Sequence, residues 1–165
     1  MLHNNTALAD PGNAAPDAPA DLTDAVTVDT QFGPMTFNRE AAINFANGML
    51  GFGGQTTFAL ANLPDPAYGN FKLMQSLDGS GLGFLVLPLD ALPDHIHPDD
   101  VAEALQALAI ETDDALVLMV VTVRKTEDKA TLSVNLRAPV VIDAKARKGV
   151  QYVLANSAYP IRHEL

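Results

Sequence analysis

The last third of the chain alternates apolar and polar residues in a way that constrains it to form β-strands. Leu132, Val134 and Leu136 occupy every second position of residues 131–137, and polar side chains stand between them. This period of two is typical of a strand that buries one face. Pro139 then precedes the apolar run 140–142. Because proline cannot donate a ladder hydrogen bond, we expect a bend or a sheet edge there.

Short strand patterns separated by glycine- and proline-containing turns fill most of the remaining chain. They are expected at residues 26–30, 35–38, 43–45, 56–60, 71–77, 84–88, 115–123 and 150–155. Gly33 lies between the first two and is available for a turn with positive φ. The glycine-rich residues 78–83 separate two strand patterns and predict a hairpin between them.

One amphipathic helix is predicted over residues 98–108. Pro98 suits the first helical position, and Val101, Ala104, Leu105 and Leu108 form one apolar stripe. Strands and helices do not alternate as they do in parallel-sheet folds. The sequence therefore predicts a mainly β protein, a small antiparallel and meander-like β-barrel with one short helix.

Residues 1–24 differ in composition from everything that follows. This segment is rich in Ala, Pro and Asp and has neither an aromatic residue nor a Lys or Arg. It cannot bury enough apolar surface to offset the entropy of ordering, so we interpret it as a disordered acidic tail. The folded domain is expected over residues 25–165.

Bulk composition narrows the functional classes. The chain has 165 residues, 48% of them hydrophobic, which is enough for one domain with a real core. It has no cysteine, which excludes disulfides and thiolate metal sites and fits a cytoplasmic protein. Its longest apolar run, residues 115–121, is too short to span a bilayer, and no signal-like leader opens the chain.

Charge is distributed unevenly along the chain, whose formal net charge is −10. Between Lys72 and Arg124 there are nine acidic residues and no basic ones, whereas from Arg124 onward eight bases face four acids. An acidic body repels nucleic acid and attracts basic partners, so direct nucleic-acid binding is disfavoured. Solubility alone is the other explanation of such a charge run.

No constellation of residues indicates catalysis or a cofactor. Residues 78–83 carry three glycines but lack the spacing of a dinucleotide or phosphate loop. His95 and His97 lie near acidic residues, yet these acids are better explained by the start of the helix than by a metal site. None of the four serines lies in a nucleophile elbow. We therefore expect neither an enzyme nor a metal or cofactor site.

The order of motifs along the chain resembles the FliW family of flagellar assembly factors. The closing segment, residues 131–165, is the longest and most specific match, and shorter matches precede it from about residue 30. In chain order these are Phe32-Gly33, Ile43-Asn-Phe45, Gly48-Met-Leu-Gly51-Phe52, Phe71-Lys-Leu-Met-Gln75-Ser76-Leu-Asp78, Phe84-Leu-Val and Leu116-Val-Leu-Met-Val-Val-Thr-Val123. The tail is additional, and Met49 stands in a loop where the family commonly has a proline-containing turn.

The resemblance implies a non-enzymatic bacterial regulator without a cofactor, cytoplasmic and monomeric when free. Proteins of this family bind flagellin before its export and also bind CsrA, an RNA-binding translational regulator, and so couple flagellin synthesis to secretion. Two alternatives remain open at this stage. The chain could act as a flagellin chaperone without CsrA control, or it could be a small-molecule-binding β-barrel or an unrecognised hydrolase.

Family-like positions that look polar or exposed are the candidate partner-binding residues: Gln75, Ser76, Asp78, Asn135 and Arg137, with Phe52 as an apolar anchor. Phe52 has two possible roles, an anchor for a partner or a plug in one end of the barrel. Asp78 and the acids from Asp90 to Asp114 are hypothesised to supply the field that opposes RNA binding by CsrA.

Overall fold

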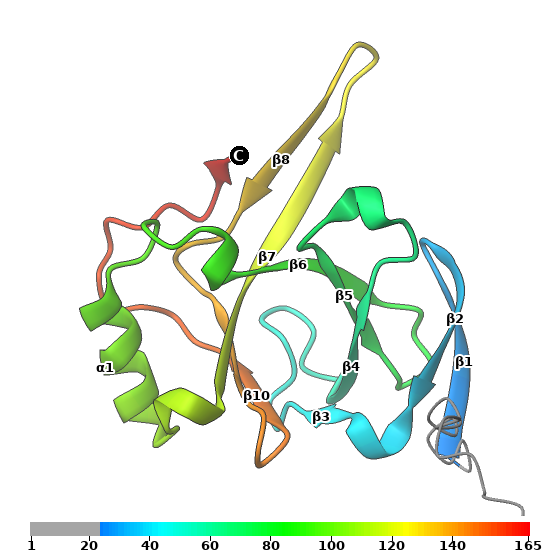
Figure 1. Cartoon of the computed structure of the whole chain (residues 1–165), viewed down its shortest axis with the longest axis horizontal. Coiled ribbons are helices and arrows are strands. Elements are labelled where there is room, and N and C mark those ends of the chain that lie inside the picture. The colour runs from blue at the N-terminus through cyan, green and yellow to red at the C-terminus, as the bar shows by residue number, and fades with distance from the viewer. Residues whose placement is uncertain (1–23) are drawn as a thin grey trace, which may run out of the picture.

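A closed barrel of seven strands forms the centre of the protein (Figure 1). The computed structural model describes residues 24–165, so the predicted tail lies almost wholly outside the described residues. The strands are β1 (Ala25–Thr30), β2 (Gly33–Asn38), β3 (Ile43–Asn44), β4 (Thr57–Asn62), β5 (Lys72–Ser76), β6 (Gly83–Pro88), β7 (Ala115–Lys125), β8 (Ala130–Val134), β9 (Val140–Asp143), β10 (Lys148–Gln151) and β11 (His163–Glu164). The helix α1 spans Pro98–Leu108.

The barrel confirms the predicted fold class. Strands β3 to β7 form an antiparallel meander, and β7 then pairs with β9, β9 with β10, and β10 with β3. The last of these pairings is parallel and consists of one residue pair, Lys148 with Asn44. The Asn44 N–H donates to the Arg147 carbonyl at 2.9 Å across this seam. The closing seam is therefore the shortest pairing of the barrel.

One edge of β7 serves two partners in succession. Residues Ala115–Leu118 pair with β9, and Val121–Lys125 pair with β8. Beyond the barrel, β7 and β8 continue as a two-stranded hairpin that projects from the body (Figure 1). We call this hairpin, residues 121–134, the arm. Strand β11 pairs with the base of β8.

The strand predicted over residues 131–137 is shorter than expected, because β8 ends at Val134. Asn135 terminates it, since its Oδ1 accepts hydrogen bonds from the Arg137 and Ala138 N–H groups, both at 3.0 Å. The chain therefore bends before Pro139 and resumes as β9, which confirms the bend predicted there.

Apolar side chains fill the inside of the barrel. The buried members of this core cluster are Ile43, Phe45, Met49, Phe58, Met74, Val86, Leu118, Val140 and Ile142. The rings of Phe45 and Phe58 meet edge to face, with centroids 5.1 Å apart. The interior is thus a packed core, as predicted from the apolar strand patterns.

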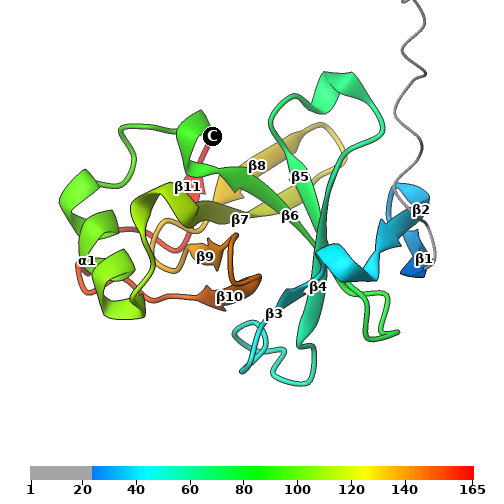
Figure 2. The ribbon, with the colours of Figure 1, turned by 60° about the horizontal axis from the view of Figure 1, so that its bottom comes forward.

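Two further apolar clusters lie outside the barrel wall. The helix α1 and the C-terminal segment cover one side through Ile96, Ala104, Leu105 and Leu154. The β1–β2 hairpin covers the other side, where Phe37 packs near Leu73 and Leu77. Figure 2 shows these two covers on opposite sides of the barrel. In the hairpin turn, Gly33 has a φ of +92°, as its position predicted.

The helix occupies the residues predicted for it, and its first turn is fixed by side chains. The Nδ1 atom of His97 accepts from the Asp99 N–H at 3.2 Å, so His97 acts as the N-cap. The Tyr159 hydroxyl donates to Oδ2 of Asp100, and the same hydroxyl accepts from the His97 N–H at 2.9 Å. Tyr159 thereby ties the C-terminal segment to the start of the helix.

Gly149 allows the barrel seam to close over Phe45. A Cβ at position 149 would overlap the Phe45 ring, whose Cε2 atom would be only 2.6 Å away. We expect Gly149→Ala to lower the free energy of unfolding by about 1–3 kcal/mol, because the ring is enclosed in the core and has nowhere to move. Urea denaturation measures this change. Gly54→Ala is the control, since a Cβ at position 54 meets no atom within 4 Å; equal losses in the two variants would contradict the prediction.

The hydrogen bond from Tyr159 lowers the pKa of Asp100, and burial together with the Asp100 carboxylate raises the pKa of Tyr159. A lowered carboxyl pKa stabilises the fold above the pKa of the unfolded state, about 3.9, and the contribution is lost as pH falls through the folded pKa. Tyr159→Phe should therefore lower the melting temperature most at neutral pH, and the difference from wild type should shrink on acidification. Tyr68→Phe is the control, because the Tyr68 hydroxyl has no hydrogen bond to a described residue. A Tyr159→Phe deficit that is constant from pH 7 to pH 3 would refute this assignment.

Candidate partner-binding surface

The open end of the barrel beside the arm carries a pocket with an exposed apolar rim. We call it the mouth pocket; its volume is about 270 Å³. Its lining comes from the glycine-rich loop after β3, from β6, from β7 and from the C-terminal segment. The lining residues are Met49, Leu50, Phe84, Val120, Thr122, Asn135, Gln151, Ile161 and Arg162.

The glycine-rich loop supplies both the plug of the barrel and its exposed rim. Met49 is 2% exposed and belongs to the core, whereas Leu50 is 57% and Phe52 44% exposed. The loop is tight, and position 48 requires glycine. Gly48 has a φ of +65°, and a Cβ there would lie only 2.8 Å from the Gly53 Cα. Met49 therefore plugs the barrel, and Phe52 remains available at the surface.

Packing holds the exposed Phe52 in place. Its ring lies edge to face against that of Phe84, with centroids 5.5 Å apart. The ring of Phe84 in turn packs against that of the core residue Phe58, with centroids 6.0 Å apart. At the other side of the rim, Ile161 is 72% exposed. An immobile aromatic ring is well suited to contact a partner, because little conformational entropy remains to be lost on binding.

Gln75 and Ser76 do not lie at the surface as their polarity suggested. Each is only 1% exposed. Gln75 Nε2 donates to the Leu82 carbonyl at 2.9 Å, and the Ser76 hydroxyl donates to Gln55 Oε1 at 2.6 Å. Gln75 thus ties together the two strands of the β5–β6 hairpin, and Ser76 joins this hairpin to the end of the glycine-rich loop; buried groups with satisfied hydrogen bonds of this kind hold a structure together.

Asp78 is exposed but already engaged. Its Oδ2 accepts from the N–H groups of Thr56 and Thr57, at 2.7 and 2.9 Å, so it anchors the start of β4. The charge of Asp78 remains at the surface, next to the hairpin that Gln75 and Ser76 stabilise.

Asn135 and Arg137 belong to the bend between β8 and β9. Asn135 lines the mouth pocket, although its amide oxygen is used by the bend itself. Arg137 is half-buried, and its Nε has no hydrogen-bond partner among the described residues. Of the six predicted residues, Asn135 lines the mouth pocket and Phe52 packs on Phe84, which lines it, whereas the other four are not among its lining residues.

Ile161 and Arg162 complete the mouth pocket but were not predicted. Ile161 stands alone between Pro160 and Arg162 without any strand or helix periodicity, so the sequence pattern did not mark it as part of a surface. An isolated apolar residue in a polar, irregular segment is a weak signal of this kind of exposure.

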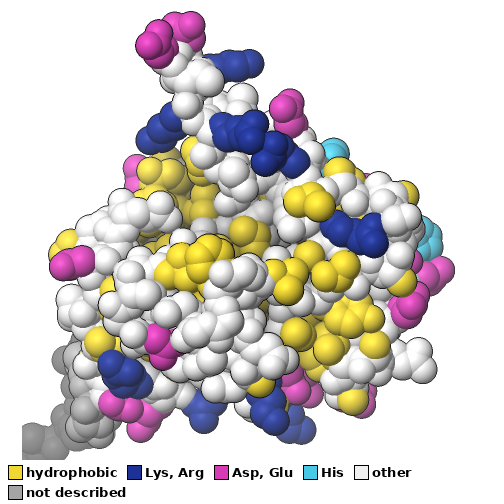
Figure 3. Space-filling model, turned by 180° about the vertical axis from the view of Figure 1, so that it is seen from behind, with side chains coloured by type: hydrophobic (Ala, Val, Ile, Leu, Met, Phe, Trp, Pro, Cys, Tyr) yellow, Lys and Arg dark blue, Asp and Glu magenta, His cyan; other side chains and the backbone are white. Residues whose placement is uncertain are grey.

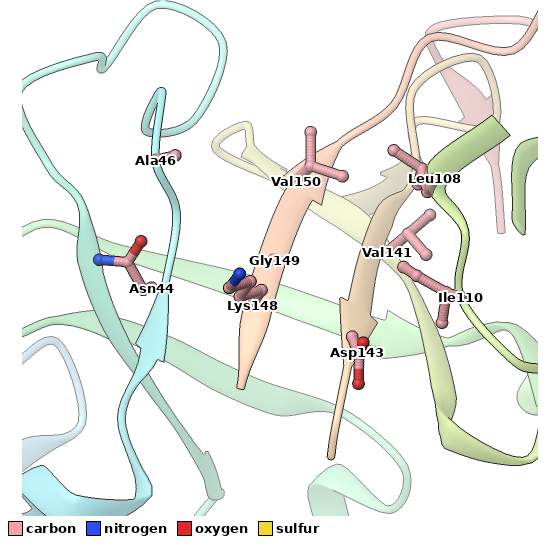
Figure 4. Close-up of a pocket in the computed structure, with 9 residues that line it drawn as sticks. All are labelled: Asn44, Ala46, Leu108, Ile110, Val141, Asp143, Lys148, Gly149 and Val150. Carbon is pink, nitrogen blue, oxygen red and sulfur yellow. The ribbon is translucent and has the colours of Figure 1, made fainter. Parts of the chain in front are cut away.

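A second pocket, of about 370 Å³, lies on the outer wall of the seam (Figure 4). Leu108 and Ile110, at the end of α1, border it on one side, and Val141 and Val150 form its floor. In this view Asp143 stands lowest among the labelled residues, and Lys148 lies beside Gly149 on β10. The mouth pocket lies at the end of the barrel and the second pocket on its outer wall, and apolar side chains of the described residues fill the interior. A small-molecule-binding barrel would instead have a deep internal cavity.

Acidic and basic residues gather in different places. The arm exposes Arg124, Lys125 and Lys129, with Glu127 and Asp128 at its tip, and Figure 3 shows Lys and Arg side chains along the arm and acidic ones at its end. Exposed acids lie on and beside α1, namely Asp94, Asp99, Glu103, Glu111 and Asp113. Among residues 24–165 no Lys or Arg forms a salt bridge with an acid, and the one ion pair joins His97 to Asp99. The acidic face is therefore not neutralised by its neighbours.

The histidines singled out in the sequence have structural contacts. His97 caps α1, and the ring of His95 packs against that of His163 with centroids 4.9 Å apart. The described part of the chain contains no group of three or more His, Cys, Asp or Glu residues that could hold a metal ion. Within the same residues, no helix is long and apolar enough to cross a membrane.

Comparison with known proteins is consistent with this geometry. The sequence profile of the FliW protein family matches residues 27–165. A flagellar assembly factor FliW of Syntrophus aciditrophicus is 32% identical over 82% of this chain and 84% of its own length. The corresponding factor of Clostridium novyi is 34% identical over 81% of this chain and 91% of its own length.

A solved structure agrees with the fold. The crystal structure of a flagellar assembly factor FliW superimposes with a TM-score of 0.65 and 28% sequence identity, over 85% of this chain and 95% of that one. The match of the profile to nearly all described residues, together with the shared barrel, establishes that the chain belongs to the FliW family of non-enzymatic flagellar assembly factors.

Proposed function

We propose that this protein binds flagellin before export and antagonises CsrA by protein–protein binding, so that flagellin translation is coupled to secretion. The observation that carries the proposal is the pairing of two unlike surfaces in a FliW protein. One is the apolar rim of the mouth pocket, and the other is the acidic face on and beside α1. The two surfaces suit partners of different chemistry.

The acidic face supports binding to CsrA. An RNA-binding protein presents basic residues, and its affinity for RNA depends steeply on how many phosphates these residues neutralise. An acidic protein docked beside them competes with the phosphates electrostatically. The exposed acids around α1 are free of salt bridges with Lys or Arg in the described structure, so their field is available to such a partner.

The apolar rim supports binding to flagellin. Flagellin is exported before its ends are packed in a filament. Until then, the apolar faces of its amphipathic terminal helices need to be shielded from water. Leu50, Phe52 and Ile161 expose apolar side chains around the mouth pocket, and the packing of Phe52 on Phe84 makes it a suitable anchor. Asn135, Arg137 and Asp78 are polar candidates for the periphery of these contacts.

This function requires no cofactor and places the protein in the cytoplasm, as a monomer when it is free. A chaperone role for flagellin without CsrA control is the second candidate, since the apolar rim by itself accounts for it. The filled barrel disfavours the small-molecule alternative.

Mutual displacement of the two partners tests the proposal. The purified protein should bind monomeric flagellin and CsrA from the same organism, and flagellin should release CsrA when titrated into the complex. Isothermal titration calorimetry and size-exclusion chromatography measure both steps. Binding of flagellin without CsrA would leave the chaperone role alone, and binding of neither would end the proposal.

The two surfaces should respond to different substitutions. Removing three charges by Asp94→Asn, Glu103→Gln and Asp113→Asn should weaken CsrA binding and reduce its salt dependence, with flagellin binding unchanged. Phe52→Ala should weaken flagellin binding by about tenfold or more, because a packed aromatic anchor contributes on the order of 2 kcal/mol.

Matched variants control for general effects of charge and apolar surface. The triple change Asp24→Asn, Asp29→Asn and Glu40→Gln removes the same charge from the exposed β1–β2 side of the protein. Val153→Ala removes an apolar side chain of similar exposure, 50%, outside the mouth pocket. If a control variant weakened binding as much as its partner variant, the assignment of that surface would be wrong.

A further inference from the structure

We propose that the free edge of β7 at the base of the arm accepts an extended segment of a protein partner as an additional strand. The segment would alternate apolar and acidic residues. This inference rests on the protein-binding function proposed above and adds a mode of recognition to it. The observation behind it is a strand edge without a partner that lies between two pockets.

The pairing of β6 with β7 ends before β7 does. Leu85 with Val121 is the last pair between them, whereas β7 continues to Lys125. From Thr122 to Lys125, β7 pairs only with β8 among the described residues. The other edge of these four residues pairs with no strand of residues 24–165.

Hydrogen-bond alternation shows which backbone groups that edge offers. The Thr126 N–H donates to the Lys129 carbonyl at 2.8 Å, and the Asn135 N–H donates to the Val120 carbonyl at 3.0 Å. In an antiparallel pair the residues of one strand point their backbone groups toward the partner and away from it in turn. The even-numbered residues of β7 therefore bond to β8, and the N–H and C=O groups of Val123 and Lys125 point to the free edge.

A pocket lies on each face of this edge. The mouth pocket takes Val120 and Thr122 from β7. On the opposite face is a pocket of about 350 Å³, which we call the outer pocket. It is lined by Gln31, Phe32, Tyr68, Phe71, Leu85, Val123, Lys125 and Leu132. The rings of Phe32 and Tyr68 meet edge to face there, 5.6 Å between centroids. Figure 3 shows apolar side chains in a hollow below the arm.

A strand added at this edge would direct successive side chains into the two pockets. Side chains alternate between the faces of a sheet, so every second residue of the segment would enter the aromatic outer pocket. The residues between them would face the mouth pocket, whose rim includes Arg162. Arg124 shares that face of β7, because it lies two positions after Thr122.

Charge complementarity identifies the occupant. Glu127 and Asp128 are exposed at the tip of the arm beside Lys129, but along the free edge the charged side chains are Arg124 and Lys125, and Arg162 is exposed nearby. Apolar residues suit the outer pocket, and acidic residues suit the basic side, which gives the alternation. A second copy of this chain is the competing occupant, but pairing two arms would bring their basic residues together.

A soluble peptide tests the edge without reference to flagellin or CsrA. The probe is a short acetylated and amidated peptide in which glutamate alternates with phenylalanine and leucine. It should bind the full chain in a salt-dependent manner, measured by isothermal titration calorimetry. Val123→Pro should weaken this binding by about tenfold, because it removes one N–H of the free edge without removing a bond to β8.

Ala130→Pro is the matched control. Ala130 lies opposite Lys125, and like Val123 it makes no backbone hydrogen bond between β7 and β8. Its N–H and C=O groups point to the other edge of the arm, away from the proposed binding edge. This variant should bind the peptide with less than about threefold change. A peptide of the same composition with its glutamates grouped at one end is the second control, since it lacks the alternation.

Hydrogen exchange on the wild-type protein gives a readout that needs no variant. The amides of Val123 and Lys125 should become protected when the peptide binds, and that of Ala130 should not.

Three results would overturn the proposal. They are equal binding of the peptide by the Val123→Pro variant, equal binding of the grouped peptide, and a lack of protection at Val123. A dimer of the free protein that Val123→Pro dissociates would assign the edge to self-association and also overturn it. Failure to bind flagellin and CsrA would instead refute the proposed function.

Discussion

The structure depends on the sharing of one edge of β7 between β9 and β8. The first part of β7 closes the barrel through β9, and the second part builds the arm with β8. Between the two pairings the chain bends, and residues 135–139 lie opposite only Met119 and Val120 of β7. Asn135 makes that bend by accepting two backbone hydrogen bonds, and Pro139 follows it. A continuous strand from residue 130 to residue 143 would keep a single register along β7, so the bend is what shifts the register by three residues between the arm and the barrel.

The same division separates the stable part of the molecule from the part suited to binding. Within the barrel, both edges of each strand are paired over at least part of its length, and the interior is filled by large apolar side chains. Along the arm, β7 loses its second neighbour, and apolar residues that would be core elsewhere line surface pockets instead. Partial pairing and incomplete covering leave both backbone and apolar groups available to a partner, as is common where a sheet recognises an extended chain.

The candidate residues divide in the same physical way. Gln75 and Ser76 are polar but buried. Their side chains can be buried because Gln75 donates a hydrogen bond to the Leu82 carbonyl and Ser76 donates one to the Gln55 side chain. Phe52 is apolar but exposed, because Met49 from the same loop already fills the end of the barrel. Polarity alone therefore gave the wrong exposure for Gln75 and Ser76, whereas for Phe52 the structure selects the exposed one of the two roles that the sequence left open. Whether a side chain at these positions is buried depends on which other side chains fill the neighbouring space. Those side chains come from segments that are distant in the sequence.

Local patterns in the sequence determined the fold class, the helix and most of the strands. The helix 98–108 follows from its apolar stripe and Pro98, and the bend before Pro139 follows from the missing donor of proline. These features depend on neighbouring residues, whose periodicity and backbone chemistry can be read directly. The single parallel pair at the seam, the double use of β7 and the surfaces that Ile161 and Arg162 complete were decided only by the tertiary structure. Each of these joins residues far apart in the chain, and no local pattern records which distant segment becomes a neighbour.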